Sequence, residues 1–474
     1  MPPKDIYVNT NSAASQPAGQ VQVPPPQSAV PQPIIPPLPK KRIPTILIIA
    51  GAVVLILVLA LLVGRILSKK SSPSGQITWW GLWEDSSIVS PLISAYESAH
   101  PGVKITYVAQ SDQDYRERLT NSLAKGTGPD IFAFHNSWVP MFKDDLDSLP
   151  ASVMGADEYS KTFYPIASSD LTNGSSIVGI PLEYDGLTLF INEDIFNAAG
   201  KTPPTTWDDL RTTARELTIK NDQGVITQSG VALGRTENVD NWPEILALLM
   251  LQNGVDLNNP TGKPAEDALT FFTVFSTIDG VWDATLPPST QMFAAGNLAM
   301  YIGPSWEAFQ VQQANPNLKF KTVPIPQLPK DNPNQPDITY ATYWAQGVWS
   351  KSTNKAVAWD FLKFLSTQDS LQKMFQNESV ERSFGEPYPR PDMASLLTNH
   401  PILGSIVAQA PGAESWYLDS RTFDGPTGMN SQLINYFGDA VNAVANGSET
   451  ATEALATCAQ GVAQVLAQYG LVAK

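Results

Sequence analysis

Cysteine is nearly absent from this sequence, and its absence excludes several kinds of site. Cys458 is the only cysteine in 474 residues. The chain therefore has no disulfide framework, no cysteine-based zinc site and no Cys-x-x-Cys redox pair. A lipoprotein anchor is also excluded, because no cysteine follows the apolar segment near the N-terminus.

Histidine is scarce as well, and the common catalytic motifs are missing. The three histidines, His100, His135 and His400, are far apart and lack the spacing of metal ligands. There is no Gly-x-Ser-x-Gly motif of a serine hydrolase and no glycine-rich loop that could hold a phosphate. We expect no metal, no cofactor and no catalytic residue.

Basic residues are outnumbered by acidic ones. The chain has 30 Lys and Arg against 45 Asp and Glu, a formal net charge of -15. Such a chain repels nucleic acid, so we expect no nucleic-acid partner. A hydrophobic content of 43% over this length is enough for two or three domains with real cores.

The N-terminal part differs in composition from the rest. Residues 1–42 are rich in proline and poor in charge, which predicts a disordered tail. Residues 43–67 form an apolar run longer than the roughly 20 residues that span a bilayer, and no cleavage site follows. They predict a single uncleaved transmembrane anchor helix, with 68–75 as a linker. Basic residues flank the run almost equally, so charge alone leaves its orientation open.

From residue 76 onward, strand and helix patterns alternate. Strands are predicted at 77–80, 103–108 and 129–134, with helical spacing at 88–100 and 115–125. This alternation predicts a largely parallel sheet. Ligands bind outside the carboxyl ends of such strands. The candidate binding residues at these ends are Trp83, Glu84, Asp112, His135, Asn136 and Trp138.

A strand that ends at Pro181 and a new one that starts after Gly186 predict a crossing between two lobes. The crossing contains three candidate ligand-binding residues, Glu183, Tyr184 and Asp185. An ordinary acidic surface loop is the alternative interpretation.

Three helix N-caps can be predicted from the sequence. After the crossing, Asn192 and Thr206 are predicted N-caps. Near the C-terminus, residues 434–471 have helical spacing, with Ser448 as the expected cap.

Aromatic residues in loops suggest a sugar ligand. Indole rings cover the apolar faces of a sugar, while carboxylates and amides bind its hydroxyls. Further candidates of this kind are Trp242, Trp306, Tyr343, Trp344, Gln346 and Trp416. Each Trp could instead be a packing residue, and those within predicted strands or helices are assigned to packing, namely Trp79, Trp207, Trp282, Trp349 and Trp359.

Four motifs occur in the order of one known family. They are Leu-Ala-Lys-Gly-Thr-Gly-Pro-Asp-Ile-Phe at 123–132, the segment 179–210 with Pro-Pro-Thr-Thr-Trp-Asp-Asp-Leu, the segment 292–306, and Ala-Trp-Asp-Phe-Leu-Lys-Phe-Leu at 358–365. From residue 76 to the C-terminus the chain thus resembles the extracellular solute-binding proteins of ABC transporters, in the maltose-binding-like branch (family 1). Ile191 departs from the family's usual tyrosine.

The resemblance implies an α/β, two-lobed periplasmic-binding-protein-like fold of type II with an interlobe cleft. Its lobes would be 76–182 with 327–380, and 186–323 with 384–474. It implies an extracellular, monomeric domain that binds a sugar or oligosaccharide and delivers it to the permease subunits of an ABC importer. It also places Trp242, Trp306 and Trp344 near the cleft.

Two alternatives come from other functional classes. A cell-surface glycoside hydrolase could use carboxylate pairs such as Glu84 with Asp85 or Glu183 with Asp185. A carbohydrate-sensing ectodomain could signal through the anchor. The second alternative is disfavoured because no recognisable domain precedes Lys40.

Overall fold

The computed structural model describes residues 58, 74–330, 332 and 335–471. The fold described below is that of the compact unit Ser71–Lys474. The predicted tail, the predicted anchor helix at 43–67 (Val58 aside) and most of the predicted linker lie outside the described residues. Within the described part, no helix combines the length and the apolar character needed to cross a membrane.

The first of two five-stranded sheets has the order β2-β1-β3-β13-β6. Its strands are β1 (Gly75–Gly81), β2 (Val103–Ala109), β3 (Ile131–His135), β6 (Ile180–Pro181) and β13 (Trp344–Val348). The first three are parallel, as expected, but β13 pairs antiparallel with both β3 and β6. The prediction of a parallel sheet is therefore confirmed for the three strands from which it was made, but it fails for the two pairs of β13, because β13 returns from the second sheet and enters at the opposite end.

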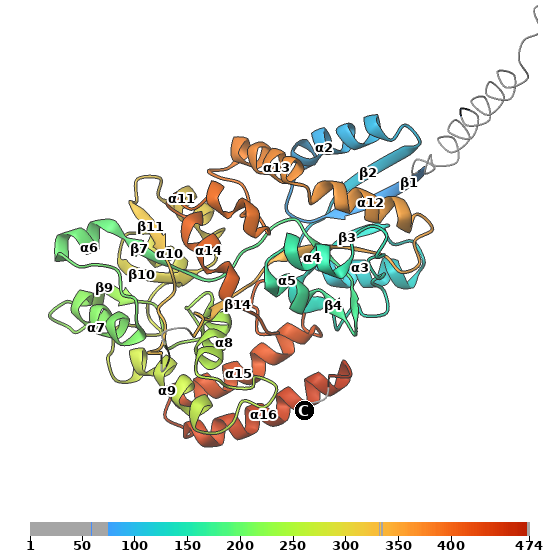
Figure 1. The fold of residues 1–474 in the computed structure, drawn as a ribbon. Coiled ribbons are helices and arrows are strands. Elements are labelled where there is room, and N and C mark those ends of the chain that lie inside the picture. Colours follow the sequence, from blue (N-terminus) through green and yellow to red (C-terminus); the bar gives the residue numbers. More distant parts are fainter. Residues whose placement is uncertain (1–57, 59–73, 331, 333–334, 472–474) are drawn as a thin grey trace, which may run out of the picture. The chain divides into compact units, whose positions relative to one another are not determined.

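The second sheet has the order β11-β7-β10-β9-β8 and is also mixed. Only β10 and β9 are parallel within it; the other pairs are antiparallel. Its strands are β7 (Thr188–Asn192), β8 (Ile219–Lys220), β9 (Ile226–Val231), β10 (Leu298–Gly303) and β11 (Phe320–Val323). Figure 1 shows the two sheets at opposite ends of the unit. We call each sheet with its covering helices the first and the second lobe.

Helices surround both sheets. Those of the first lobe are α2 (Ser86–Ala99), α3 (Tyr115–Ala124), α4 (Ala156–Thr162), α5 (Pro165–Asp170), α12 (Lys355–Leu365) and α13 (Gln368–Glu381). Those of the second are α6 (Glu193–Ala199), α7 (Trp207–Leu217), α8 (Trp242–Gln252), α9 (Lys263–Thr277), α10 (Ser289–Ala294), α11 (Glu307–Ala314), α14 (Leu403–Gln409), α15 (Met429–Ala445) and α16 (Ala451–Gln468). Two short strand pairs complete the fold, β4 (Thr172–Asn173) with β5 (Ser176–Ile177) and β12 (Thr339–Tyr340) with β14 (Ala413–Glu414).

Two chain segments cross between the lobes next to each other. The outgoing segment joins β6 to β7, and the returning one passes through β12. Leu187 N donates to Tyr340 O at 2.9 Å, and Thr342 N donates to Asp185 O at 3.0 Å. Gly186 is required here because a Cβ would lie 2.4 Å from Tyr340 O. The crossings are thus tied together by backbone hydrogen bonds.

Local capping follows the sequence closely in the second lobe. Asn192 Oδ1 accepts from Ile195 N at 3.2 Å, and Thr206 Oγ1 accepts from Asp209 N at 3.1 Å, so both predicted N-caps are confirmed.

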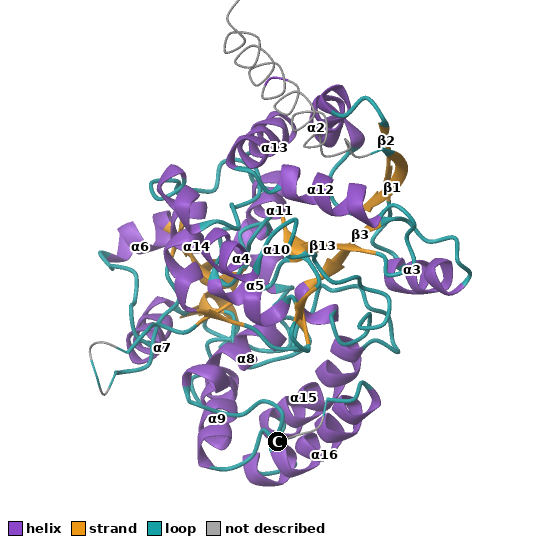
Figure 2. Ribbon diagram, turned by 45° about the vertical axis from the view of Figure 1, so that its right-hand side comes forward, coloured by secondary structure: helices purple, strands orange, loops and turns teal. Residues whose placement is uncertain are grey.

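The prediction of Ser448 as the N-cap of the last helix is wrong. Ser448 donates back to Ala443 O, and Thr450 caps α16 instead. Thr450 and Glu453 form a reciprocal capping box, in which the glutamate satisfies the cap's own N–H, and Ser448 has no such partner three residues on. Figure 2 shows α15 and α16 packed together beside α9, consistent with their contacts.

The five tryptophans assigned to packing are all buried, as predicted. Trp282 is an example, since it is fully buried and its Nε1 donates to Asn238 Oδ1 at 2.8 Å. An indole buries roughly 150–250 Å², which stabilises the fold by about 4–6 kcal/mol at ~25 cal/mol per Å². Both lobes therefore have rigid cores that can hold the residues between them.

Candidate functional site

A cavity of about 390 Å³ lies between the two lobes. The first lobe and its loops supply Trp83, Asp112, His135, Glu183, Thr342, Tyr343, Trp344, Arg382 and Glu386. The crossing, the second lobe and the loop before α15 supply Asp185, Glu244, Pro304, Trp306, Phe309, Gln310, Arg421 and Phe423. This volume is within the range of small-molecule sites.

Strand ends place the first-lobe side chains. Trp83 follows β1, Asp112 follows β2, and His135 is the last residue of β3, so the carboxyl ends of the parallel strands face the cavity. Trp344 starts β13, and because β13 is antiparallel to β3, Trp344 pairs with His135 at the same edge of the sheet.

Aromatic rings form one wall of the cavity. Trp83 is 41% exposed, and its ring lies 5.6 Å from Trp344 in an edge-to-face arrangement and 5.8 Å from Phe423. Phe423 is itself 38% exposed and has φ +53°, an uncommon conformation for a bulky residue. Exposed rings that gather in a cavity are available to stack on a ligand.

Trp306 forms part of the opposite wall, and a cation covers one of its faces. The guanidinium of Arg421 lies 5.1 Å from the centre of the Trp306 ring. Its Nη2 is 3.1 Å from Glu307 Oε1, and Glu307 is fully buried. Burial raises the pKa of Glu307 to about 7, while Arg421 lowers it.

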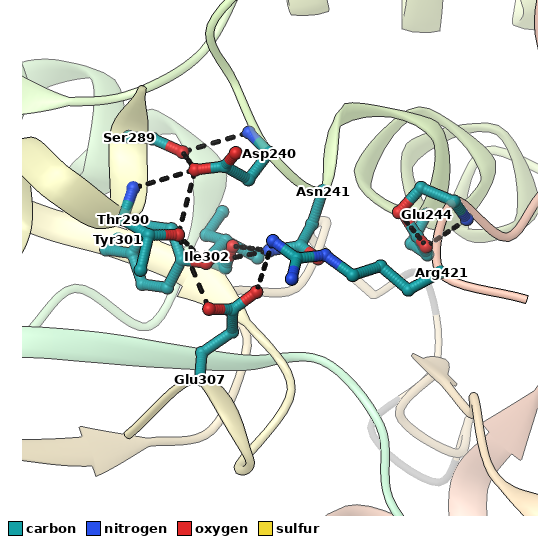
Figure 3. A network of polar contacts seen from close by, with 10 residues as sticks. Asp240, Asn241, Glu244, Ser289, Thr290, Tyr301, Ile302, Glu307 and Arg421 are labelled. Atoms are coloured by element: carbon teal, nitrogen blue, oxygen red, sulfur yellow. Dashed lines mark hydrogen bonds and ion pairs between the residues drawn. The ribbon is translucent and has the colours of Figure 1, made fainter. Parts of the chain in front are cut away.

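A polar network fixes this wall from behind (Figure 3). Asp240 Oδ2 accepts from Ser289 Oγ at 3.0 Å and from Thr290 N and Oγ1 at 2.8 Å each. Tyr301 OH accepts from Asn241 Nδ2 at 2.8 Å and contacts Thr290 Oγ1 at 2.9 Å. The wall is therefore rigid before any ligand binds.

Asp185 is held at the crossing by the second lobe. It is buried, and its carboxylate accepts from Gly186 N at 2.7 Å, Ser305 N at 3.1 Å and Ser305 Oγ at 2.8 Å. Burial raises the pKa of Asp185 to about 7, against these hydrogen bonds. The carboxylate joins the crossing to the loop that presents Trp306.

Four glutamates surround one arginine on the other side of the cavity. Arg382 Nη2 lies 2.9 Å from Glu386 Oε1 and 3.4 Å from Glu378 Oε2. Burial and Glu378 raise the pKa of Glu84 to about 8, and burial with Glu386 raises that of Glu378 to about 7. Burial also raises the pKa of Glu183 well above its ordinary value. The cluster is crowded with carboxylates that share one cation.

Arg382 also contacts the second lobe, since its guanidinium lies 5.1 Å from the centre of the Phe309 ring. Such a cation–π contact contributes about 0.5–2 kcal/mol. It links the end of α13 to α11 across the cavity.

His135 is a neutral side chain in this site. Burial lowers its pKa to about 3, and its ring nitrogens contact Ser137 Oγ at 2.8 Å and Thr342 Oγ1 at 3.1 Å. Across the described residues, no group of three or more His, Cys, Asp or Glu could hold a metal ion.

Eight of the fifteen residues proposed from sequence line the cavity. They are Trp83, Asp112, His135, Glu183, Asp185, Trp306, Tyr343 and Trp344. The other seven do not line it, namely Glu84, Asn136, Trp138, Tyr184, Trp242, Gln346 and Trp416.

Packing and hydrogen bonding occupy several of these seven. Trp242 lies against Gly438 of α15, and Trp138 is fully buried behind Trp344, with ring centres 5.2 Å apart. Trp416 Nε1 donates to Asn258 Oδ1 at 3.2 Å. The interpretation that places Trp242 near the cleft does not match this position, because the residue begins a helix that faces the core.

The remaining four support the cavity from behind its surface. Asn136 donates to Asp170 Oδ2 at 2.9 Å, and Gln346 Oε1 accepts from Trp79 Nε1 at 2.9 Å. Tyr184 stacks near Tyr164 and Tyr343, and Glu84 belongs to the glutamate cluster around Arg382.

Sequence reasoning missed nine residues that line the cavity. They are Glu244, Pro304, Phe309, Gln310, Thr342, Arg382, Glu386, Arg421 and Phe423. Thr342 precedes the candidate Tyr343, and Pro304 lies within the motif at 292–306, so both were close to residues already singled out. Arg421 and Phe423 lie in an irregular loop without a periodic pattern, and only the fold brings that loop to the cavity.

Comparison of the sequence with known proteins finds similarity to binding proteins. Residues 80–371 match the sequence profile of the family described as "Bacterial extracellular solute-binding protein". A Brucella abortus protein named only as a binding protein is 24% identical over 296 residues, covering 60% of this chain and 69% of that protein. The maltotriose-binding protein of Pyrococcus abyssi is 22% identical over 375 residues, covering 72% and 77%.

Solved structures show the same two-lobed fold. The cyclic alpha-maltosyl-1,6-maltose binding protein from Arthrobacter globiformis superposes with a TM-score of 0.68 at 19% identity. The match covers 83% of this chain and 100% of that chain.

Proposed function

Because the chain belongs to the family of bacterial extracellular solute-binding proteins, we propose that it captures a sugar or oligosaccharide between its lobes and delivers it to an ABC permease. One observation carries the choice of ligand. The cavity offers the exposed rings of Trp83 and Phe423 and the half-buried indole of Trp306, beside carboxylates. Apolar faces with a polar rim match the surface of a sugar.

Closure of the lobes around the ligand is part of this proposal. The crossings form a natural hinge, and a ligand that contacts both walls shifts the population toward the closed form. The lobe limits of 76–182 with 327–380, and 186–323 with 384–474, also belong to the proposal. The end of β6 at Pro181 and the start of β7 at Thr188 support the first of these boundaries.

A screen of mono- and oligosaccharides against the full-length chain tests the ligand class. The detergent should carry no sugar headgroup, since such a headgroup could occupy the cavity. We expect at least one saccharide to raise the melting temperature in a dose-dependent manner, because binding to the folded state stabilises it. A panel of neutral, aminated and acidic saccharides without effect would contradict the proposal.

We further propose that the ligand is bound without turnover, although the cavity holds several carboxylates. Long incubation with the tightest ligand should leave it intact by chromatography. Products that disappear in the Asp185→Asn variant would favour the glycoside hydrolase alternative.

A membrane anchor at 43–67, with the rest of the chain outside the cell, completes the proposal. The apolar run supports it, and the family is extracellular. Intact-mass measurement of the native protein should find the run retained. A mature N-terminus near Gln76 would refute the anchor.

A further inference from the structure

One carboxylate oxygen in the cavity wall has no partner. Glu244 lines the cavity although only 3% of its side chain is exposed. Its Oε1 accepts from Ser420 N at 2.5 Å and from Ser420 Oγ at 2.7 Å. Its Oε2 is buried and has no hydrogen bond to any described residue. An unsatisfied buried acceptor costs about 1–3 kcal/mol, and more when it is charged.

A second unpaired carboxylate lies nearby. Asp419 is fully buried; the Thr342 side chain lies against its carboxylate and lowers its pKa, but no ion pair with a described residue neutralises it. It is close enough to Glu244 for the two negative charges to repel, and burial together with Glu244 raises the pKa of Asp419. Both positions therefore favour the arrival of positive charge.

The cations near the cavity are already engaged. Among the residues that line it are five carboxylates, Asp112, Glu183, Asp185, Glu244 and Glu386, against the two arginines Arg382 and Arg421. Arg421 pairs with Glu307, and Arg382 pairs with Glu378 and Glu386. His135 stays neutral at physiological pH. Arg421 also lowers the pKa of Glu244, but its guanidinium is paired with Glu307, and no described residue donates a hydrogen bond to Oε2 of Glu244.

We propose that the saccharide bound in this cavity carries a protonated amine, which donates to Oε2 of Glu244. This inference rests on the proposed function. An ammonium brings three donors and one positive charge, which is what the unpaired oxygen lacks. The hydrogen bond is charge-assisted and roughly twice as strong as a neutral one.

A metal ion fits this position less well than an amine. Calcium takes 6–8 oxygen ligands, and the described residues include no group of three or more acidic or histidine side chains suited to a metal. The other neutralising agent is a proton on Glu244, which would let the carboxyl donate to a neutral sugar hydroxyl. A protonated amine on the sugar and a proton on Glu244 predict different preferred ligands, an aminated sugar in the first case and a neutral sugar in the second. Binding data therefore distinguish the two.

Calorimetric titration of the full-length protein at pH 7 tests the inference. Glucosamine and its β-1,4-linked disaccharide are compared with glucose and cellobiose, which differ only by a hydroxyl in place of the ammonium. N-Acetylated forms keep the nitrogen but lose the charge. We expect the aminated sugars to bind at least tenfold more tightly than both other series.

The Glu244→Gln variant isolates the charge. Its Oε1 can still accept from Ser420, so the loop before α15 keeps its anchor. We expect the variant to lose the tenfold preference and to bind neutral sugars within about threefold of the original. Glu266→Gln is the matched control, because Glu266 also lies in the first turn of a helix whose second residue is a proline, away from the cavity.

Each result decides between the proposals. The inference is wrong if Glu244→Gln weakens the binding of all sugars by the same factor, or if the variant keeps the preference for aminated sugars. The inference is also wrong if neutral sugars bind the original protein as tightly as aminated ones do. This comparison does not need the variant to fold, and such a result leaves the proposed function standing. If no member of the three series binds, and the wider saccharide screen also fails, the proposed function fails with it.

Discussion

At the scale of single residues, tryptophans in this protein divide into those that hold the fold and those that face the cavity. Trp282 is fully buried with its Nε1 in a hydrogen bond, whereas Trp83 has 41% of its surface exposed. Removing a core indole leaves a void, while removing a cavity indole takes away ligand contact and a few ring contacts within the cavity wall. The same substitution therefore has different consequences at the two positions.

We expect Trp83→Ala and Trp306→Ala to weaken sugar binding by roughly 1–3 kcal/mol, about ten- to a hundredfold in Kd. Their unfolding midpoints should stay near that of the original protein. Trp282→Ala, the control, should instead lower the free energy of unfolding by about 3–5 kcal/mol. Calorimetry with the tightest sugar and denaturant unfolding measure the two effects. Loss of stability without loss of affinity in Trp83→Ala would assign it to packing.

At the scale of elements, the two crossings between the lobes depend on one close approach. Gly186 lies where a side chain would meet the backbone of Tyr340, and its neighbours hydrogen-bond across the same gap. Any movement of one crossing must therefore carry the other with it. In the proposed closure, we expect the two crossings to move together.

Gly186→Ala should pry the crossings apart and cost about 1–3 kcal/mol of stability, the usual range for overpacking. Sugar affinity should fall as well, because Asp185 next to it holds the Trp306 loop. Gly155→Ala is the control, since its added Cβ meets nothing within 4 Å. Denaturant midpoints and titration of the two variants provide the comparison. If the two variants had the same stability and the same sugar affinity, the approach of Gly186 to Tyr340 would tolerate a Cβ, and this prediction would be wrong.

The same elements show what the sequence could and could not predict. Strands and the caps at Asn192 and Thr206 were predictable, because periodicity and capping chemistry are local. The Pro-Leu-Glu-Tyr-Asp-Gly crossing was also readable from its proline and glycine. The antiparallel β13 was not, since strand direction depends on which end of the sheet the returning chain reaches. Arg421 and Glu244 were missed because their partners lie far away in sequence.

At the scale of the whole molecule, several buried carboxyls keep their protons at a higher pH than exposed ones do. The pKa of Glu84 is raised to about 8 and those of Glu378 and Asp185 to about 7, chiefly by burial. Unfolded carboxyls release their protons near pH 4. Between pH 6.5 and 8.5 the folded chain thus binds more protons than the unfolded chain, and stability falls as pH rises.

We expect the free energy of unfolding to drop by an amount on the order of 1–3 kcal/mol from pH 6.5 to pH 8.5. His135 opposes this trend only below its ordinary pKa of 6.5, which sets the lower limit of the window. Thermal unfolding across this range measures the drop. Glu378→Gln should flatten the dependence, because it removes one raised carboxyl and the repulsion on Glu84. A melting temperature that rises with pH would contradict the burial of these charges.

The contact between Trp83 and Trp344 also gives the protein an optical signal of its own. Two indoles 5.6 Å apart at an interplanar angle of 73° are close enough for their strong transitions to couple, and such coupling produces a paired band in far-ultraviolet circular dichroism. Trp83 is the only tryptophan among the exposed large hydrophobic side chains of the described residues. A solute that settles on it changes this band and the fluorescence of the pair, so occupancy of the cavity can be followed without a label.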